Sequence, residues 1–120
     1  MFILTTASLC TLAAEAAKID IYNEVGKGLT ITARCKSIAG SLGAHEIAYG
    51  VGVYEIISEN LVSCTFQWVG ASHSFDIYDP KRDRIRCRYC VWLIRPGGPC
   101  LQDTDINVIR NEQYCYPWKN

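Results

Sequence analysis

The sequence lacks an excess of either charge, because its 120 residues hold 12 Lys and Arg against 12 Asp and Glu. Proteins that bind nucleic acid through phosphate contacts carry a clear basic excess, so this balance argues against that class. No apolar run approaches the ~18 residues that a membrane-spanning helix requires. The 49% hydrophobic content is also too high for a typical disordered chain. These absences leave a small globular protein.

Internal repeats, linkers and low-complexity tracts are absent as well, so the length allows one domain. No G-x-S-x-G elbow, H-E-x-x-H motif or phosphate-binding glycine loop is present. His73 stands among Ser and Asp residues, but neighbours on one strand point alternately apart and form no triad. His45 has no such neighbours, and Asp103 and Asp105 are interpreted as turn residues. We therefore expect no enzymatic activity, no catalytic residue and no cofactor.

The N-terminal residues predict a secretory signal peptide over residues 1–16 and a single domain over residues 17–120. The first thirteen residues carry no charged side chain, and Ala14-Glu15-Ala16 has the small-x-small form that signal peptidase accepts. A buried N-terminal helix is the alternative interpretation. Cleavage after Ala16 would remove Cys10 and Glu15, leaving six of the seven cysteines and a net charge of about +1.

The six remaining cysteines predict a disulfide framework, because an even number in a short secreted chain is typical of one. Six cysteines permit 15 pairings, which the sequence does not resolve. Cys35, Cys64 and Cys90 share strand faces with apolar residues, so at least one buried bridge is expected among them. Cys100 and Cys115 lie outside those strands and are expected to pair with each other.

Cys87-Arg88-Tyr89-Cys90 is a CxxC motif, which is found in redox enzymes and in zinc sites. A thioredoxin-type pair opens a helix, whereas here the second cysteine enters an apolar strand-like run. Zinc sites usually combine two such motifs, and this chain has one, with Cys64 and Cys100 as the further ligands it could offer. Structural disulfides are therefore favoured over redox chemistry, and no metal site is expected.

Alternation of apolar and polar residues predicts β-strands along most of the domain. The clearest runs are residues 19–22, 29–35, 63–68 and 75–77, and residues 44–57 are expected to supply one or two more. Residues 90–94 are apolar on both faces, as in a central strand. Several short strands and no long helical period predict an all-β fold, an antiparallel β-sandwich of about seven or eight short strands.

The segment 81–88 is the one charge anomaly, with five basic residues against one acidic residue. One interpretation is a solvated loop, which most charge runs are. The other is a recognition loop for an acidic receptor or a wall polysaccharide. Its residues would be Lys81, Arg82, Asp83, Arg84, Arg86 and Arg88. In this second interpretation, charge reversal at Arg82 and Arg84 should leave the fold intact.

The aromatic tail is the remaining candidate site. Tyr114, Tyr116 and Trp118 would either bind a partner or cover a sheet edge.

A series of short segments between residues 19 and 100 now identifies a family by order and spacing. They are Ile21-Tyr22-Asn23-Glu24, Leu29-Thr30-Ile31, Cys35-Lys36-Ser37, Leu42-Gly43, Cys64-Thr65-Phe66-Gln67-Trp68, Phe75-Asp76-Ile77-Tyr78, Cys87-Arg88-Tyr89-Cys90-Val91-Trp92 and Gly98-Pro99-Cys100. On these segments the sequence resembles the plant self-incompatibility S-protein homologues. It departs from the family pattern at Ala39-Gly40-Ser41, at Tyr54-Glu55-Ile56-Ile57 and in the tail around Cys115.

The resemblance implies a secreted, extracellular β-sandwich that is held by disulfides, displays hydrophilic loops and has no enzymatic activity. The best-understood role in the family is that of a pistil-secreted ligand that inhibits incompatible pollen tubes. The expected partner is a cell-surface receptor protein, bound by a monomer that enters no membrane. A secreted defence protein that binds an enzyme or a glycan is the alternative.

Overall fold

The computed structural model describes residues 16–102 and 113–118. The expected signal peptide with Cys10, apart from its last residue, and the expected turn residues Asp103 and Asp105 lie outside the described residues. Within the described part of the chain, no helix is long and apolar enough to cross a membrane.

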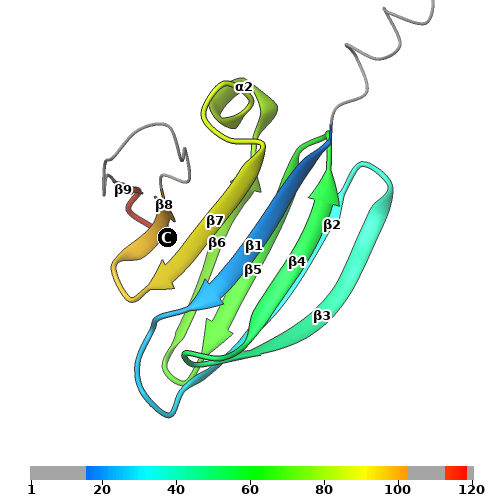
Figure 1. Cartoon of the computed structure of the whole chain (residues 1–120). Helices are drawn as coiled ribbons and strands as arrows, with labels where there is room; N and C mark the ends of the chain where they lie inside the picture. Colours follow the sequence, from blue (N-terminus) through cyan, green and yellow to red (C-terminus); the bar gives the residue numbers. More distant parts are fainter. Residues whose placement is uncertain (1–15, 103–112, 119–120) are drawn as a thin grey trace, which may run out of the picture.

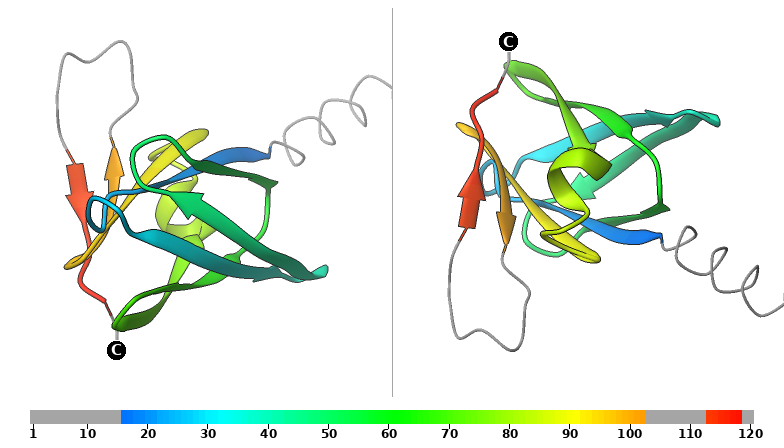
Figure 2. Two further views of the ribbon diagram at one scale, coloured as in Figure 1. Left: turned by 90° about the horizontal axis from the view of Figure 1, so that it is seen from below. Right: turned by 90° about the horizontal axis from the view of Figure 1, so that it is seen from above.

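Two β-sheets pack face to face, as Figures 1 and 2 show. The five-stranded sheet has the order β4 (Val53–Ser58), β1 (Ala17–Asn23), β7 (Tyr89–Arg95), β8 (Gly98–Gln102) and β9 (Gln113–Cys115). The four-stranded sheet has the order β3 (Gly40–Ala48), β2 (Thr30–Ser37), β5 (Val62–Trp68) and β6 (Ala71–Tyr78). A single-turn helix, α2 (Pro80–Asp83), follows β6. The prediction of an all-β sandwich is confirmed.

The strand arrangement differs from the prediction in two details. The described residues form nine strands rather than seven or eight, because β8 and β9 arise from a segment interpreted as turn and tail. The turn after β7 uses only Pro96 and Gly97, so pairing resumes at once between Arg95 and Gly98. Strands β1 and β7 pair in parallel, which departs from a purely antiparallel sandwich.

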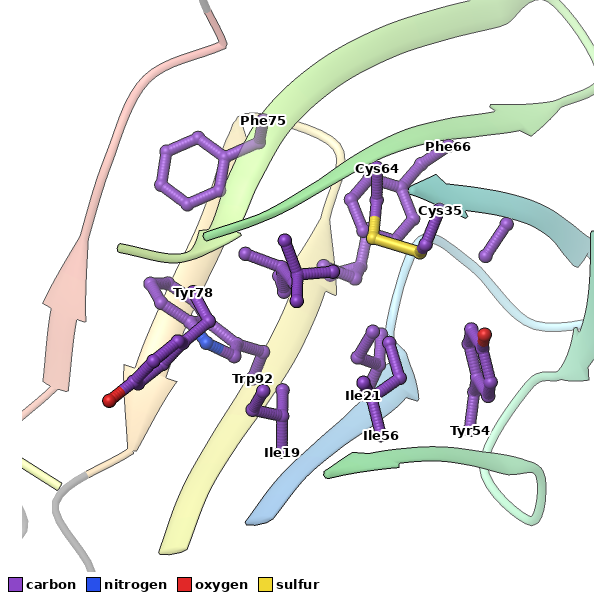
Figure 3. Close-up of a cluster of buried hydrophobic side chains, with 14 of the residues drawn as sticks. Ile19, Ile21, Cys35, Tyr54, Ile56, Cys64, Phe66, Phe75, Tyr78 and Trp92 are labelled. Carbon is purple, nitrogen blue, oxygen red and sulfur yellow. A yellow bond between two sulfur atoms is a disulfide. The ribbon is translucent and has the colours of Figure 1, made fainter. Parts of the chain in front are cut away.

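The core lies between the sheets and is built from alternate strand positions (Figure 3). Ile19 and Ile21 on β1 and Trp92 on β7 have no exposed surface, and Phe66 on β5 is equally buried in the opposite sheet. Burying a side chain of this size contributes about 1.5–3 kcal/mol. The apolar segment 90–94 forms most of β7, the middle strand of its sheet, as expected of a central strand.

Cys35 and Cys64 form a disulfide inside this core (Figure 3). They are directly opposite each other on β2 and β5, with their Cα atoms 4.0 Å apart. Both are 2% exposed. This is the kind of buried bridge that the strand pattern predicts.

Asn23, at the end of β1, fixes the turn that joins the two sheets. Its side-chain amide donates to the carbonyl oxygens of Leu29 and Ile47, both at 2.8 Å. Its side-chain oxygen accepts from the backbone N–H of Val25 at 3.0 Å. Because Asn23 is 1% exposed, the hydrogen bonds satisfy a polar group that would otherwise be buried at a cost.

Candidate recognition surface

The basic segment 81–88 crosses one end of the sandwich between β6 and β7, where Figure 2 shows α2 between the two sheets. Asp79 caps α2 by accepting the backbone N–H of Lys81 at 3.0 Å, and Pro80 occupies the first turn, where its missing N–H costs nothing. The Cys87–Cys90 disulfide closes the segment before β7 begins its buried part. The segment is therefore held at both of its ends.

Arg82 and Asp83 face inward and form an ion pair. The guanidinium donates to both carboxylate oxygens of Asp83, each at 2.6 Å, and to the carbonyl oxygen of Asp76 at 2.7 Å. The same carboxylate accepts the backbone N–H of Asp79 at 2.9 Å. Burial opposes the charge of Arg82, but the hydrogen bond and the negative charge of Asp83 outweigh it and raise the pKa of Arg82.

The guanidinium of Arg82 also lies over three aromatic rings of the core. Its central carbon is 4.9 Å from the ring centre of Phe75 and 5.3 Å from those of Trp92 and Tyr116. Cation–π contacts of this kind are strongest where water is excluded. Arg82 thus joins the helix to both sheets and to the C-terminal tail.

The expectation that Arg82 and Asp83 are exposed recognition residues is wrong. The Asp83 side chain is fully buried and that of Arg82 is 20% exposed. Charge reversal at Arg82 would place a second carboxylate beside a buried one, so from the structure we now expect this change to destabilise the fold.

The other basic residues of the segment are exposed: Lys81, Arg84, Arg86 and Arg88, which we call the basic face. Arg84 lies beside the Tyr78 hydroxyl; burial raises the pKa of Tyr78, and the nearby Arg84 offsets part of that rise. Arg86 donates to the Tyr116 hydroxyl at 2.6 Å. Receptor contact at these positions stays a prediction.

The C-terminal tail covers the side of the sandwich. Both views of Figure 2 show it running from β9 to the β5–β6 turn. Cys115 is bonded to Cys100, the pairing expected from the sequence. Trp118 stacks on His73 with ring centres 4.8 Å apart and donates its indole N–H to the carbonyl oxygen of Pro96 at 3.0 Å. For Trp118, the structure therefore supports the sheet-edge interpretation.

The two histidines considered as catalytic candidates make packing contacts, and the cysteines considered as zinc ligands form disulfides. His73 belongs to the tail stack, and His45 stacks on Tyr54 with ring centres 4.0 Å apart. In the described part of the chain, no group of three or more His, Cys, Asp and Glu side chains is placed to hold a metal ion.

Sequence reasoning missed the inward half of the basic segment. The only signal in the sequence is Asp83, the one acidic residue in a basic run. An isolated acidic residue of this kind is equally consistent with a solvent-exposed charge. The contacts of Trp118 could not be predicted either, because the only relevant signal in the sequence is that the residue is aromatic.

Comparison with known proteins identifies the family. The family model for plant self-incompatibility protein S1 matches residues 18–118. The chain belongs to this family. S-protein homolog 5 of Arabidopsis thaliana is 34% identical over 110 residues, covering 88% of this chain and 80% of the relative. S-protein homolog 3 of the same plant is 36% identical over 112 residues, covering 83% and 71%.

A solved structure of a self-incompatibility protein homologue, described as one of a widespread family of small, highly stable, secreted proteins from plants, has the same fold. The TM-score is 0.59 at 15% identity, over 91% of this chain and 99% of that one. The family model and the Arabidopsis relatives confirm the family that the sequence segments indicated, and the solved structure confirms its fold.

Proposed function

We propose that this S1-family protein is a secreted ligand that binds a cell-surface receptor through the basic face. Family membership and the secreted character stated for the related homologue support secretion. The observation that carries the receptor contact is the division of the 81–88 segment by the Arg82–Asp83 pair. That pair anchors the segment and leaves Lys81 and Arg84 exposed on either side of it.

Rigidity is what makes the face suitable for recognition. A flexible basic loop loses conformational entropy when it binds, whereas a segment already held by a cap, an ion pair and a disulfide loses little. Here the cap is Asp79, the ion pair is Arg82–Asp83 and the disulfide is Cys87–Cys90. A receptor with an acidic surface would meet positive charges in fixed positions.

Electrostatic attraction of this kind mainly raises the association rate. Exposed charges are screened beyond about 10 Å at 0.1 M salt, so binding should weaken as the salt concentration rises.

Binding of labelled protein to living cells of the source plant tests the proposal. The variant Lys81→Glu/Arg84→Glu should lose at least tenfold in affinity. The matched control Lys27→Glu/Arg34→Glu has the same net charge but alters the exposed β1–β2 turn and the exposed face of β2, where Arg34 donates to Gln67, and should bind nearly as the wild type does. Equal affinity of both variants, with unchanged unfolding midpoints, would refute the role of the basic face.

Protease treatment of the cells separates a protein receptor from a glycan. If the receptor is a protein, mild digestion of the cell surface should abolish saturable binding. Binding that survives protease digestion but is removed by pectin-degrading enzymes would show that the partner is a wall polysaccharide and not a protein receptor.

A further inference from the structure

We propose that the Cys100–Cys115 bridge is a site of thiol–disulfide exchange, at which a small thiol of the glutathione class attacks Cys115 and displaces Cys100. The bridge joins β8 to β9, the edge strand of the five-stranded sheet. Exchange modifies the protein chemically and needs no receptor, so it goes beyond the proposed function. In secreted proteins, exposed disulfides are the ones that thiols exchange or reduce most readily.

Exposure distinguishes this bridge from the other two. Cys115 is the one exposed cysteine among the six that form disulfides in the described part of the chain. Both cysteines of the Cys35–Cys64 bridge are 2% exposed, Cys90 has no exposed surface, and Cys87 is partly buried. A thiolate in solution therefore reaches Cys115 more easily than any other bridged cysteine.

The departing sulfur also distinguishes this bridge. Exchange at Cys115 releases the Sγ of Cys100 as a thiolate, and the guanidinium Nη1 of Arg95 lies 3.6 Å from that atom. A cation at this distance stabilises the negative charge that develops on the departing sulfur. Exchange at Cys87 would instead release a thiolate at Cys90, inside the hydrophobic core, where burial opposes the charge.

Arg95 is held beside the bridge by contacts on both sides of β8. It ends β7, where its Nε donates to Glu24 at 2.9 Å, and its Nη1 donates to the side-chain oxygen of Gln113 on β9 at 2.8 Å. The side chains of Arg95 and Glu24 are 35% and 41% exposed, so water screens their ion pair. The pair therefore does not cancel the effect of the cation on Cys100.

The exchange is balanced between the protein and the small thiol. The incoming thiolate forms a sulfur–sulfur bond with the Sγ of Cys115, the bond between Cys115 and Cys100 breaks, and the Cys100 thiolate takes a proton from water. No net oxidation occurs in this step. A second small thiol then reduces the mixed disulfide to the Cys115 thiol and leaves as an oxidised dimer, or Cys100 attacks the mixed disulfide and restores the bridge.

Loss of the bridge would loosen β9, which is short and lies at the sheet edge (Figure 2). Its three residues pair with β8. The Arg86 guanidinium lies 4.7 Å from the ring centre of Tyr114 on β9 and donates to the hydroxyl of Tyr116 in the tail. Exchange would therefore remove two contacts from Arg86, a residue of the basic face. An effect on receptor binding rests on the proposed function, whereas the exchange does not.

Peptide mapping after brief treatment with reduced glutathione tests the direction of exchange. The full oxidised protein, as secreted by expressing plant cells, is treated, and free thiols are then alkylated with N-ethylmaleimide before mass spectrometry. We expect glutathione on Cys115 and the alkyl label on Cys100, with the other two bridges intact. A first adduct on any other cysteine would overturn the proposal, as would the absence of an adduct on Cys115.

The rate at which the Cys115 adduct forms tests the role of Arg95. Arg95→Gln removes the cation and should slow the reaction about fivefold, whereas Arg95→Lys keeps a cation and should react nearly as the wild type does. The matched control Glu24→Gln breaks the ion pair but keeps the cation, so it should not slow the reaction. Equal slowing in Arg95→Gln and Glu24→Gln would contradict the role of the cation.

Binding of the Cys115 adduct to cells measures the consequence for the basic face separately. We expect weaker binding than that of the untreated protein, because Arg86 has lost its contacts with the tail. Unchanged binding would refute the link to the basic face, while the mapped adduct alone decides whether the exchange site exists.

Discussion

The guanidinium of Arg82 holds the fully buried carboxylate of its chain neighbour Asp83 through two hydrogen bonds of 2.6 Å. The pair joins α2 to the core, because the same guanidinium lies over the rings of Phe75 and Trp92. One basic residue of the segment is thereby structural, while its neighbours Lys81 and Arg84 are exposed.

Replacing Arg82 should destabilise the protein far more than replacing Arg84. Arg82→Ala leaves the carboxylate of Asp83 buried without its cation, which typically costs about 3–5 kcal/mol. Arg84→Ala alters an exposed side chain and should cost within about 0.5 kcal/mol. Denaturant unfolding of both variants measures the difference. Similar losses of stability in the two variants would show that the Arg82–Asp83 pair contributes little to folding.

Gly98→Ala should displace the C-terminal tail, and Gly97→Ala should not. Gly98 has a φ of +147°, and an added methyl group would overlap the carbonyl oxygen of Tyr116 and lie 2.9 Å from its carbonyl carbon. A methyl group at Gly97 would meet nothing within 4 Å. Trp118 fluorescence and protease sensitivity of the tail report the displacement. A docked tail in Gly98→Ala would contradict the close approach.

Opening the Cys100–Cys115 bridge should release the tail and leave the sandwich folded. The bridge spans 15 residues, for which the chain-entropy model gives about 3 kcal/mol. The Cys35–Cys64 bridge and the core between the sheets are untouched in Cys100→Ser/Cys115→Ser. Limited proteolysis followed by mass spectrometry should find new cleavage within the tail only, and an unchanged cleavage pattern would argue against the anchor.

The stability of the protein should fall as the pH rises from about 10 to about 12, partly because of Tyr89. Its hydroxyl donates to Asp20 at 2.7 Å, and this hydrogen bond raises the pKa of Tyr89 from 10.0 to about 12. A raised tyrosine pKa stabilises the fold below the unfolded pKa, and that contribution disappears as the pH rises through the folded value.

Carbon-13 titration of the Tyr89 ring measures this pKa directly. In Asp20→Asn the negative charge is gone, so Tyr89 should titrate closer to pH 10. A pKa that is identical in Asp20→Asn and the wild type would show that the carboxylate is not the cause.

The β-sandwich could be predicted because the pattern of apolar and polar residues that indicates each strand lies within that strand's own sequence. Alternation in β1 and β5, and the two-sided apolar run of β7, follow directly from which faces are buried. The pairing of Cys35 with Cys64 depends on the register between strands that are distant in the sequence. From the sequence alone, the buried bridge could be assigned only to two of the three cysteines Cys35, Cys64 and Cys90. The roles of Arg82 and Trp118 depend on side chains from β6 and β7 that no local pattern connects to them.

Site-specific photo-crosslinking tests the receptor contact most directly. A photoreactive phenylalanine derivative is placed at position 81, in the basic face, or at position 27, on the β1–β2 turn, and each protein is irradiated on living cells. A receptor contact through the basic face predicts a crosslinked membrane protein from position 81, abolished by excess unlabelled protein, and none from position 27. Saturable cell binding with crosslinks only from position 27, or with none from position 81, would contradict it.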